Sequence, residues 1–170
     1  MNKRAIILQG SSHSFGNTHR IVTEVKDQTG IEIIDLKTKE IGQFDYEFKN
    51  RDDDFLPLIR EIVDNYDLII FATPVYWYSM SGIMKKFFDR ISDCLKIEKE
   101  TGRKLRGKSM AVISCGYDEE IKDGYFMPFV ESAKYLGMSY LGEVHTWIQD
   151  GTISPEVRNR IDLFIQQLQE

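Results

Sequence analysis

The sequence predicts an α/β fold: a doubly wound, five-stranded parallel sheet with strand order 2-1-3-4-5 and helices on both faces. Short apolar runs alternate five times with segments in which apolar residues recur every three to four positions, as in strands that alternate with amphipathic helices. The first, third and fourth runs are purely apolar, whereas the second and fifth carry charged residues. Strands buried on both faces belong at the centre of a sheet and polar strands at its edges, and the order 2-1-3-4-5 satisfies both conditions.

Each element can be placed on the chain by its pattern. The predicted strands occupy residues 5–8, 31–36, 68–72, 110–113 and 140–148. The predicted helices present apolar faces made of Ile21, Val22 and Val25; of Phe55, Ile59, Ile62, Val63 and Tyr66; of Ile83, Met84, Phe87, Phe88, Ile91 and Leu95; of Phe126, Phe129, Val130, Ala133 and Leu136; and of Val157, Ile161, Phe164, Ile165 and Leu168. Ser154 and Pro155 are the expected N-cap and first residue of the last helix. A Rossmann order needs a sixth strand, for which the chain has no room, so the flavodoxin-like order is preferred.

The topology also sorts the loops by the edge of the sheet at which they lie. Because the strands are parallel, the loops that follow them share one edge, where ligands bind in such folds. These ligand-end loops are residues 10–17, 37–54, 73–82, 114–124 and 148–154. The basic segment 96–107 runs from a helix back to a strand, so we expect an exposed connection at the opposite edge.

Size and composition limit the class of protein. A chain of 170 residues, 42% hydrophobic and 29% charged, suits one globular domain spanning residues 1–170. Its net charge of −5 argues against binding to nucleic acid or to an anionic membrane. No apolar run approaches the roughly 18 residues that cross a bilayer, and the first run is too short for a signal peptide, so we expect a cytoplasmic protein. Two cysteines, Cys94 and Cys115, are fewer than the about four thiolates of an iron–sulfur cluster, and no metal site is expected.

The first ligand-end loop, G-S-S-H-S-F-G-N-T at residues 10–18, has the composition of a phosphate-binding loop. Free N–H groups at a helix N-terminus, with Ser and Thr hydroxyls, can surround a phosphate without a basic side chain. The predicted phosphate ligands are Ser11, Asn17 and Thr18, with His13 and Ser14 behind them. Considered alone, the loop is explained equally well by helix capping.

The loop after the third strand, residues 73–82, is rich in aromatic side chains and hydroxyls, which suit a flat aromatic ligand. The ring contacts predicted here are Pro74, Val75, Tyr76, Trp77, Tyr78 and Ser79. The loop after the fourth strand offers Ser114, Gly116, Tyr117 and Asp118, either as contacts to the edge of the ring or as an ordinary turn. A phosphate site beside a planar-ring site fits flavin mononucleotide, FMN.

Two further features of the sequence, an aromatic cluster and a histidine, have simple structural interpretations. Phe44, Tyr46 and Phe48 alternate in the segment 37–54, where they either pack that loop down or form a wall for a substrate. His145 lies on an edge strand and is predicted to have a structural role.

The two loops resemble those of the NADPH-dependent FMN reductase family. Residues 10–18 are similar to the family's G-S-x-R-x-x-G-N-T loop, and residues 74–90 to its segment P-V-Y-W-x-S-M-P-G-x-x-K-x-F-x-D-R, without a gap. The matching residues of the second segment are Pro74, Val75, Tyr76, Trp77, Ser79, Met80, Gly82, Lys85, Phe87, Asp89 and Arg90. The chain departs from the pattern at His13, where Arg is common, at Tyr78, where Gly is common, and at Ser81, where Pro is common. With His13 in place of arginine, less fixed positive charge lies beside the phosphate. Tyr78 can narrow or cover the ring site.

The resemblance implies an enzyme, an FMN-dependent NAD(P)H oxidoreductase. NADH or NADPH would pass hydride to bound FMN, and a quinone, flavin, azo or nitro compound would receive it, with no side chain needed as acid or base. The resemblance also implies a site at a subunit interface, hence a homodimer or homotetramer. Lys85, Asp89 and Arg90 are then either subunit contacts or surface ion pairs of little energetic value.

Two alternatives share the fold. A flavodoxin-type one-electron carrier would bind FMN without a substrate of its own, although a net charge of −5 is modest for such carriers. A signalling domain would bind no flavin, but a receiver domain needs acidic residues near the first strand, where this chain has Gln9-Gly-Ser. The sequence therefore favours the reductase over the carrier, and both over the signalling domain.

Overall fold

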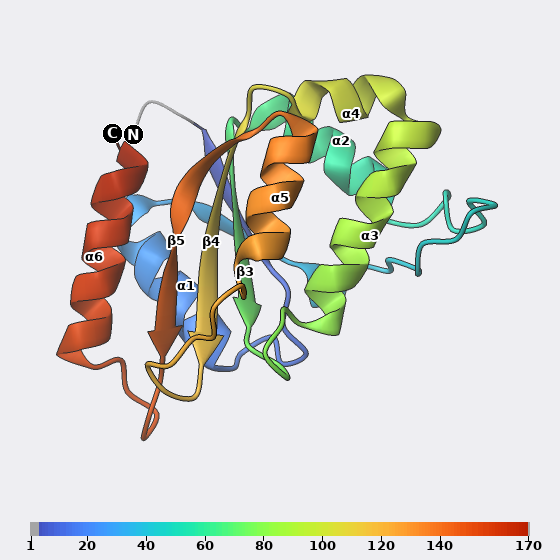
Figure 1. Ribbon diagram of the computed structural model, residues 1–170. Coiled ribbons are helices and arrows are strands. Elements are labelled where there is room, and N and C mark those ends of the chain that lie inside the picture. The colour runs from blue at the N-terminus through green and yellow to red at the C-terminus, as the bar shows by residue number, and fades with distance from the viewer. Residues whose placement is uncertain (1–3, 170) are drawn as a thin grey trace.

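In the computed structural model, which describes residues 4–169, five parallel strands form one twisted sheet between two layers of helices (Figure 1). The strands are β1 (Ala5–Gln9), β2 (Glu32–Asp35), β3 (Leu68–Pro74), β4 (Ser109–Gly116) and β5 (Ser139–Trp147). Their order is β2-β1-β3-β4-β5, which confirms the predicted topology and both predicted edge strands. β3 ends at Pro74, opposite Cys115 of β4, because proline has no N–H to continue the ladder.

The helices divide between the two faces of the sheet. α1 (Asn17–Thr29) and α6 (Pro155–Gln169) cover one face, whereas α2 (Phe55–Asn65), α3 (Gly82–Lys96) and α5 (Met127–Leu136) cover the other. Alternate residues of each central strand enter the two cores: Ile69 and Phe71 face α2, α3 and α5, while Ile70 faces α1 and α6. Both faces are buried, which explains why these strands read as continuous apolar runs.

The segment 96–107 is only partly as predicted. It lies at the edge opposite the ligand-end loops, but it contains a short helix, α4 (Lys99–Leu105), in which Thr101 and Leu105 are buried. The expectation of a wholly exposed connection is therefore wrong. Gly102 allows α4 to approach α3, since a Cβ atom there would lie 2.3 Å from the carbonyl oxygen of Cys94.

Two smaller expectations also need correction. β2 is shorter than predicted because Leu36 leaves the ladder and begins a 3-10 turn, η1 (Leu36–Thr38), in which the Asp35 carboxylate accepts from the Lys37 N–H at 3.0 Å. Val130 does not belong to the buried face of α5, since 36% of its surface is exposed. The start of α6 is as predicted: the Ser154 hydroxyl accepts from the N–H of Val157 at 3.2 Å. Within residues 4–169, no helix combines the length and hydropathy needed to cross a lipid bilayer.

Candidate functional site

The loops that follow β1, β3 and β4 come together at the ligand-end edge of the sheet. The Ser12 and Tyr76 hydroxyls share a hydrogen bond of 2.7 Å between the first and third loops. Ser81 donates to the carbonyl oxygen of Gly10 at 2.6 Å, and the N–H of Val75 donates to the carbonyl oxygen of Cys115 at 2.9 Å. The predicted phosphate loop and the predicted ring loop are therefore neighbours in space.

The phosphate loop is held in shape from beneath by a buried amide. Gln9 donates to the carbonyl oxygen of Ser14 at 3.0 Å, and its own oxygen lies 3.0 Å from Nδ1 of His19, which must then donate. From the side, Lys37 donates to the carbonyl oxygen of Ser12 at 2.7 Å. At the base, a Cβ atom on Gly10 would lie 2.9 Å from Met84, so only glycine fits there. No sequence pattern indicated these roles of Gln9 and Lys37.

The beginning of α1 has no side-chain cap. Its N-cap is Gly16, which makes no side-chain hydrogen bond, so capping does not explain the Ser, Asn and Thr of this loop. Within the described residues, the N–H groups of Asn17, Thr18 and His19 donate to no protein group. Free amides and the positive end of the helix dipole together form a typical anion site.

The side chains predicted to bind phosphate differ in their accessibility. Asn17 and His13 are exposed and Ser14 is half-buried. The Ser11 hydroxyl is buried and accepts from the N–H of His13 at 3.2 Å. Thr18 is buried as well, and its side chain lies near the Cys115 thiol. Burial raises the pKa of Cys115 to about 11, although hydrogen bonds with Thr146 and Thr18 act in the opposite direction, so this cysteine is a protonated thiol at neutral pH.

The ring loop is a tight two-residue hairpin. Tyr76 and Ser79 pair across it, with N–H to carbonyl distances of 2.9 and 3.1 Å, and the two central residues, Trp77 and Tyr78, have φ of 49° and 62°. Such a turn normally takes Asn and Gly, because bulky residues are strained at positive φ. Trp77 is 94% exposed and Tyr78 68%, which excludes a role for either in the core. Conformations of this kind cost of the order of 1–3 kcal/mol each and concentrate at functional sites.

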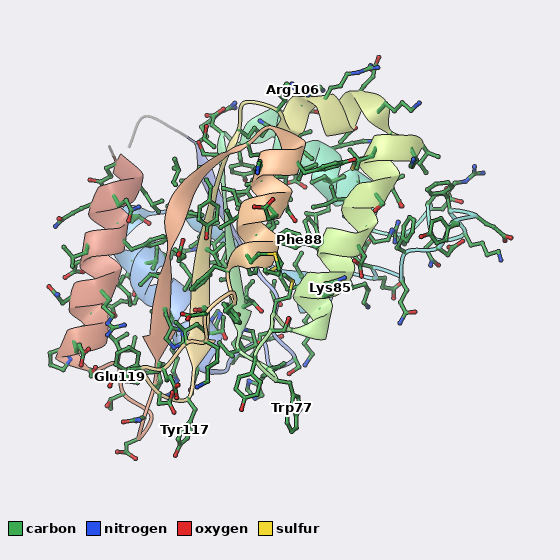
Figure 2. The ribbon with its side chains drawn as sticks, viewed as in Figure 1. Trp77, Lys85, Phe88, Arg106, Tyr117 and Glu119 are labelled. Carbon is green, nitrogen blue, oxygen red and sulfur yellow. The ribbon has the colours of Figure 1, made fainter. Side chains whose placement is uncertain are left out.

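A cavity of about 390 Å³ lies between the ring loop and the loop after β4. It is lined by Val75, Trp77, Tyr78, Gly116, Tyr117, Asp118, Glu120, Ile121, Lys122 and Tyr125. Figure 2 shows Trp77 and Tyr117 projecting side by side from the same edge of the molecule. Six of the predicted ring contacts therefore border one cavity, together with Tyr125, which the sequence did not single out.

The loop after β4 is held by a buried histidine. Nδ1 of His145 lies 2.8 Å from the Ser114 hydroxyl, and Nε2 lies 3.0 Å from the carbonyl oxygen of Asp118. A carbonyl can only accept, so Nε2 carries the proton, and the neutral ring accepts from Ser114 at Nδ1. Burial lowers the pKa of His145, although its hydrogen bond to Asp118 acts in the opposite direction. Gly116 must lack a side chain, since a Cβ atom would lie 2.9 Å from the imidazole.

Arg90 is not at the helix surface, where the helical period placed it. It is 1% exposed, and its guanidinium bonds two carboxylates, those of Asp53 at 2.5 and 3.2 Å and Asp93 at 2.9 Å. It also donates to the carbonyl oxygens of Gly42 at 3.1 Å and Asn50 at 2.9 Å. The expectation of a surface ion pair is wrong for this residue, which fixes the base of the loop 37–54 to α3.

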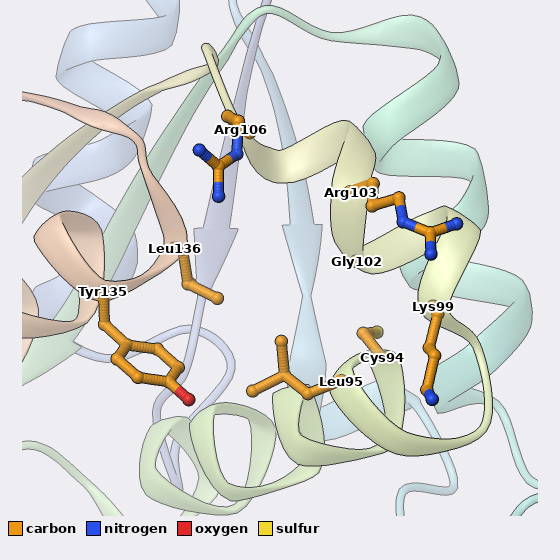
Figure 3. A pocket seen from close by; sticks show the side chains of 8 residues that line it. All are labelled: Cys94, Leu95, Lys99, Gly102, Arg103, Arg106, Tyr135 and Leu136. Carbon is orange, nitrogen blue, oxygen red and sulfur yellow. The ribbon is translucent and has the colours of Figure 1, made fainter.

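The other predicted ion pair of this helix is at the surface. Lys85 and Asp89 pair at 2.5 Å and are about half exposed. A second cavity, of about 250 Å³, lies between α3, α4 and α5 near the opposite edge of the sheet (Figure 3). It holds Lys99, Arg103 and Arg106, so these basic residues are remote from the phosphate loop.

Comparison with known proteins agrees with this geometry. A family model described as NADPH-dependent FMN reductase matches residues 4–152. The chain belongs to the NADPH-dependent FMN reductase family. Among curated relatives, a putative NAD(P)H-dependent FMN-containing oxidoreductase, YwqN, of Bacillus subtilis (strain 168) is 27% identical over 150 residues, 81% of each chain. An NADPH azoreductase of Bacillus sp. (strain OY1-2) is 27% identical over 96 residues, 56% of this chain and 54% of the relative.

Several solved structures share the fold. The Trp repressor binding protein from Bacillus subtilis superposes with a TM-score of 0.75 at 24% identity, covering 96% of this chain and 97% of that one. An FMN-dependent NADH-azoreductase from Bacillus anthracis, solved with FMN, superposes with a TM-score of 0.67 at 12% identity, covering 95% and 96%. The predicted family, fold and cofactor class are thus confirmed: this is an FMN reductase family member with a flavodoxin-like sheet.

Proposed function

We propose that this chain takes hydride from NADH or NADPH with the help of bound FMN and delivers it to a small acceptor, a quinone, free flavin, azo or nitro compound. The observation that carries the proposal is the contact between the two halves of the site. The uncapped start of α1 and the aromatic cavity meet at one edge, joined through the Ser12–Tyr76 hydrogen bond. A ligand with a phosphate at one end and a flat ring at the other matches an anion site that adjoins an aromatic cavity.

The residues present fit FMN in three ways. The amides at the start of α1, with Ser11, His13, Ser14, Asn17 and Thr18 around them, would hold the phosphate. The loops 74–79 and 114–118 would hold the ring, since six of their residues line the cavity. Tyr125, whose buried hydroxyl has no partner in the protein, is one of the residues that line the cavity. Bound FMN supplies the hydride chemistry, and the protein supplies position and exclusion of water.

The openness of the cavity favours a reductase over a one-electron carrier. A hydride enzyme must leave one ring face free for a nicotinamide, whereas a carrier covers both faces. The loop 37–54 was the segment able to supply a second wall, but none of its residues lines the cavity. It projects to the side of α3, away from the ring loop (Figure 1), and its Tyr46 is 89% exposed. Phe44, Tyr46 and Phe48 instead pack on one another, with ring centroids 5.1 and 6.2 Å from Phe44.

The decisive experiment mixes FMN-loaded protein with NADH and, separately, with NADPH under anaerobic conditions and follows the flavin absorbance. We expect rapid bleaching by at least one of the two, and return of the colour when a quinone or an azo compound is added. An azo compound is a good first acceptor because one relative is named as an azoreductase. No bleaching by either nucleotide, with slow reduction by dithionite only, would favour the flavodoxin-type carrier.

We also propose that the working form is a homodimer or homotetramer. The ring loop and its neighbour expose Trp77, Tyr78 and Tyr117 together at one edge, and a sizeable exposed aromatic patch marks an interaction surface. Light scattering at micromolar concentration tests this, and a monomeric mass would count against it.

A further inference from the structure

The Tyr125 hydroxyl is an unusual atom in this fold. Tyr125 is only 5% exposed, and its hydroxyl has no hydrogen-bond partner. Within residues 4–169, one other buried side-chain polar atom shares this condition, the hydroxyl of Tyr140. Most buried polar groups in proteins are paired, because leaving one unpaired costs about 1–3 kcal/mol. A buried hydroxyl without a partner therefore calls for an explanation.

Packing does not supply that explanation. The Tyr125 ring packs edge to face on Phe126, with centroids 4.9 Å apart, and at a tilt on Phe129, at 6.5 Å. These contacts use the ring alone, so phenylalanine would make them equally well. Burial raises the pKa of Tyr125, which keeps the hydroxyl protonated and able to donate at any physiological pH.

The position of Tyr125 explains why its hydroxyl has no partner. The residue lines the 390 Å³ cavity together with Val75, Gly116 and Ile121. We propose that its hydroxyl is a ligand-binding group, which donates a hydrogen bond to a carbonyl oxygen or ring nitrogen of the flat aromatic molecule that fills the cavity. The proposal rests on the proposed function, in which that molecule is the ring of FMN. The ligand class is thus a neutral heteroaromatic ring with a hydrogen-bond acceptor on its inner edge.

The neighbouring wall can admit such a ring. The hydroxyl is closed to solvent when the loops lie as they do here, so a ligand must part them slightly. Trp77 and Tyr78, whose left-handed conformations are strained, form one of those walls, and neither side chain is packed into the core. Movement of these two residues alone therefore leaves the packed core undisturbed.

The test is Tyr125→Phe, with Tyr140→Phe as the matched control. Tyr140 lies at the start of β5, next to Met110 and so at the edge opposite the site, and the substitution removes a buried hydroxyl there too, one that lies near Glu143. In the FMN-free proteins, both substitutions should leave the unfolding temperature unchanged or raise it, because each removes an unpaired polar group. The dissociation constant of FMN, measured by quenching of flavin fluorescence, should rise about 3- to 10-fold in Tyr125→Phe only.

The outcomes separate the two proposals. Weaker FMN binding in Tyr125→Phe, with unchanged or raised stability, supports the assignment, since a merely structural tyrosine would lose stability instead. Unchanged FMN affinity in Tyr125→Phe, while the wild-type protein binds FMN, overturns the assignment and leaves the proposed function standing. Failure of the wild-type protein to bind FMN overturns both. An equal loss of affinity in Tyr140→Phe shows a general effect of the substitution and also overturns it.

Discussion

Arg90 and Tyr125 are both buried polar residues on the same face of the sheet, and the protein treats them in opposite ways. All the donor directions of the Arg90 guanidinium are used, by two carboxylates and two backbone carbonyls, and the group lies 4.9 Å above the ring of Phe55. The Tyr125 hydroxyl has no protein partner at all. The two residues therefore differ in role: Arg90 is satisfied within the protein and holds the architecture, whereas Tyr125 lines a cavity and is free to bind the proposed ligand.

The Arg90 network explains how a long loop without periodicity is ordered. Asp53 also accepts from the N–H groups of Gly42 at 2.7 Å and Phe55 at 2.9 Å, so it joins both ends of the loop to the guanidinium. Burial alone would raise the pKa of Asp53, but the hydrogen bonds from Arg90, Phe55 and Gly42 outweigh it and hold the pKa below its usual value. Asp53 is therefore ionised throughout the physiological range.

The largest effect is expected from Arg90→Ala. Removal of one partner from a buried ion-pair network leaves uncompensated charges, so the free energy of unfolding should fall by about 3–5 kcal/mol. Urea denaturation of the FMN-free protein measures it. If Arg90 serves the architecture alone, the FMN affinity of the folded variant should stay within about threefold of wild type. Arg90→Lys is the matched control, because it keeps the charge but cannot make the forked contacts. Its free energy of unfolding should lie between those of wild type and Arg90→Ala.

The next largest effect concerns the phosphate end of the site. Asn17→Ala should weaken FMN binding by about 1–3 kcal/mol, as expected for the loss of one charge-assisted hydrogen bond. Riboflavin, which has the same ring but no phosphate, should bind wild type and variant alike. A variant that weakens FMN and riboflavin equally would place Asn17 at the ring or at neither group. Ser12→Ala is a useful comparison, since the Ser12 hydroxyl shares a hydrogen bond with Tyr76 of the ring loop.

The fold could be predicted from the sequence because its signals are local. Strand polarity gave the order of the sheet, and helical periods gave the covered faces. Arg90 was misplaced because its spacing and charge fit an exposed helix flank, while the carboxylates that bury it come from a loop without any pattern. α4 was missed because Gly102, which permits its close packing on α3, reads in a sequence as a break in a helix.

The two loops predicted to bind the ligand do lie together at one edge of the sheet, but several of their details had no signal in the sequence. Loop composition at strand ends indicated the phosphate and ring loops, since topology brings those ends together. It did not indicate Tyr125, which precedes α5 and reads as part of an ordinary aromatic cluster. Nor did it predict the positive φ at Trp77 and Tyr78, which the usual turn residues would have signalled.

His145 offers an intermediate case, a buried group that is satisfied but titratable. Because burial lowers its pKa, the folded protein binds the proton more weakly than the unfolded chain does. The contribution of the neutral His145 ring to stability is therefore complete above the pKa of the unfolded chain, about 6.5. It is lost as the pH falls through the lower pKa of the folded protein. The free energy of unfolding of wild type should decline more steeply below about pH 6.5 than that of His145→Gln. Gln has no titrating group, and parallel pH profiles would exclude this role for His145.

The smallest effect is expected from Lys85, one turn before Asp89 on the helix that carries Arg90. The Lys85–Asp89 pair is about half exposed on both sides, and exposed pairs of this spacing contribute about 0.3–0.5 kcal/mol. Lys85→Ala, Asp89→Ala and the double variant form a cycle whose coupling energy should not exceed that range.

The same proteins also separate the two interpretations of this segment. If the pair is only a surface ion pair, the mass by light scattering stays that of wild type, whereas a subunit contact would lower the mass at the same concentration. This one helix would then hold two kinds of ion pair, one buried and essential to the fold at Arg90, and one at Lys85 that the protein can lose with little change.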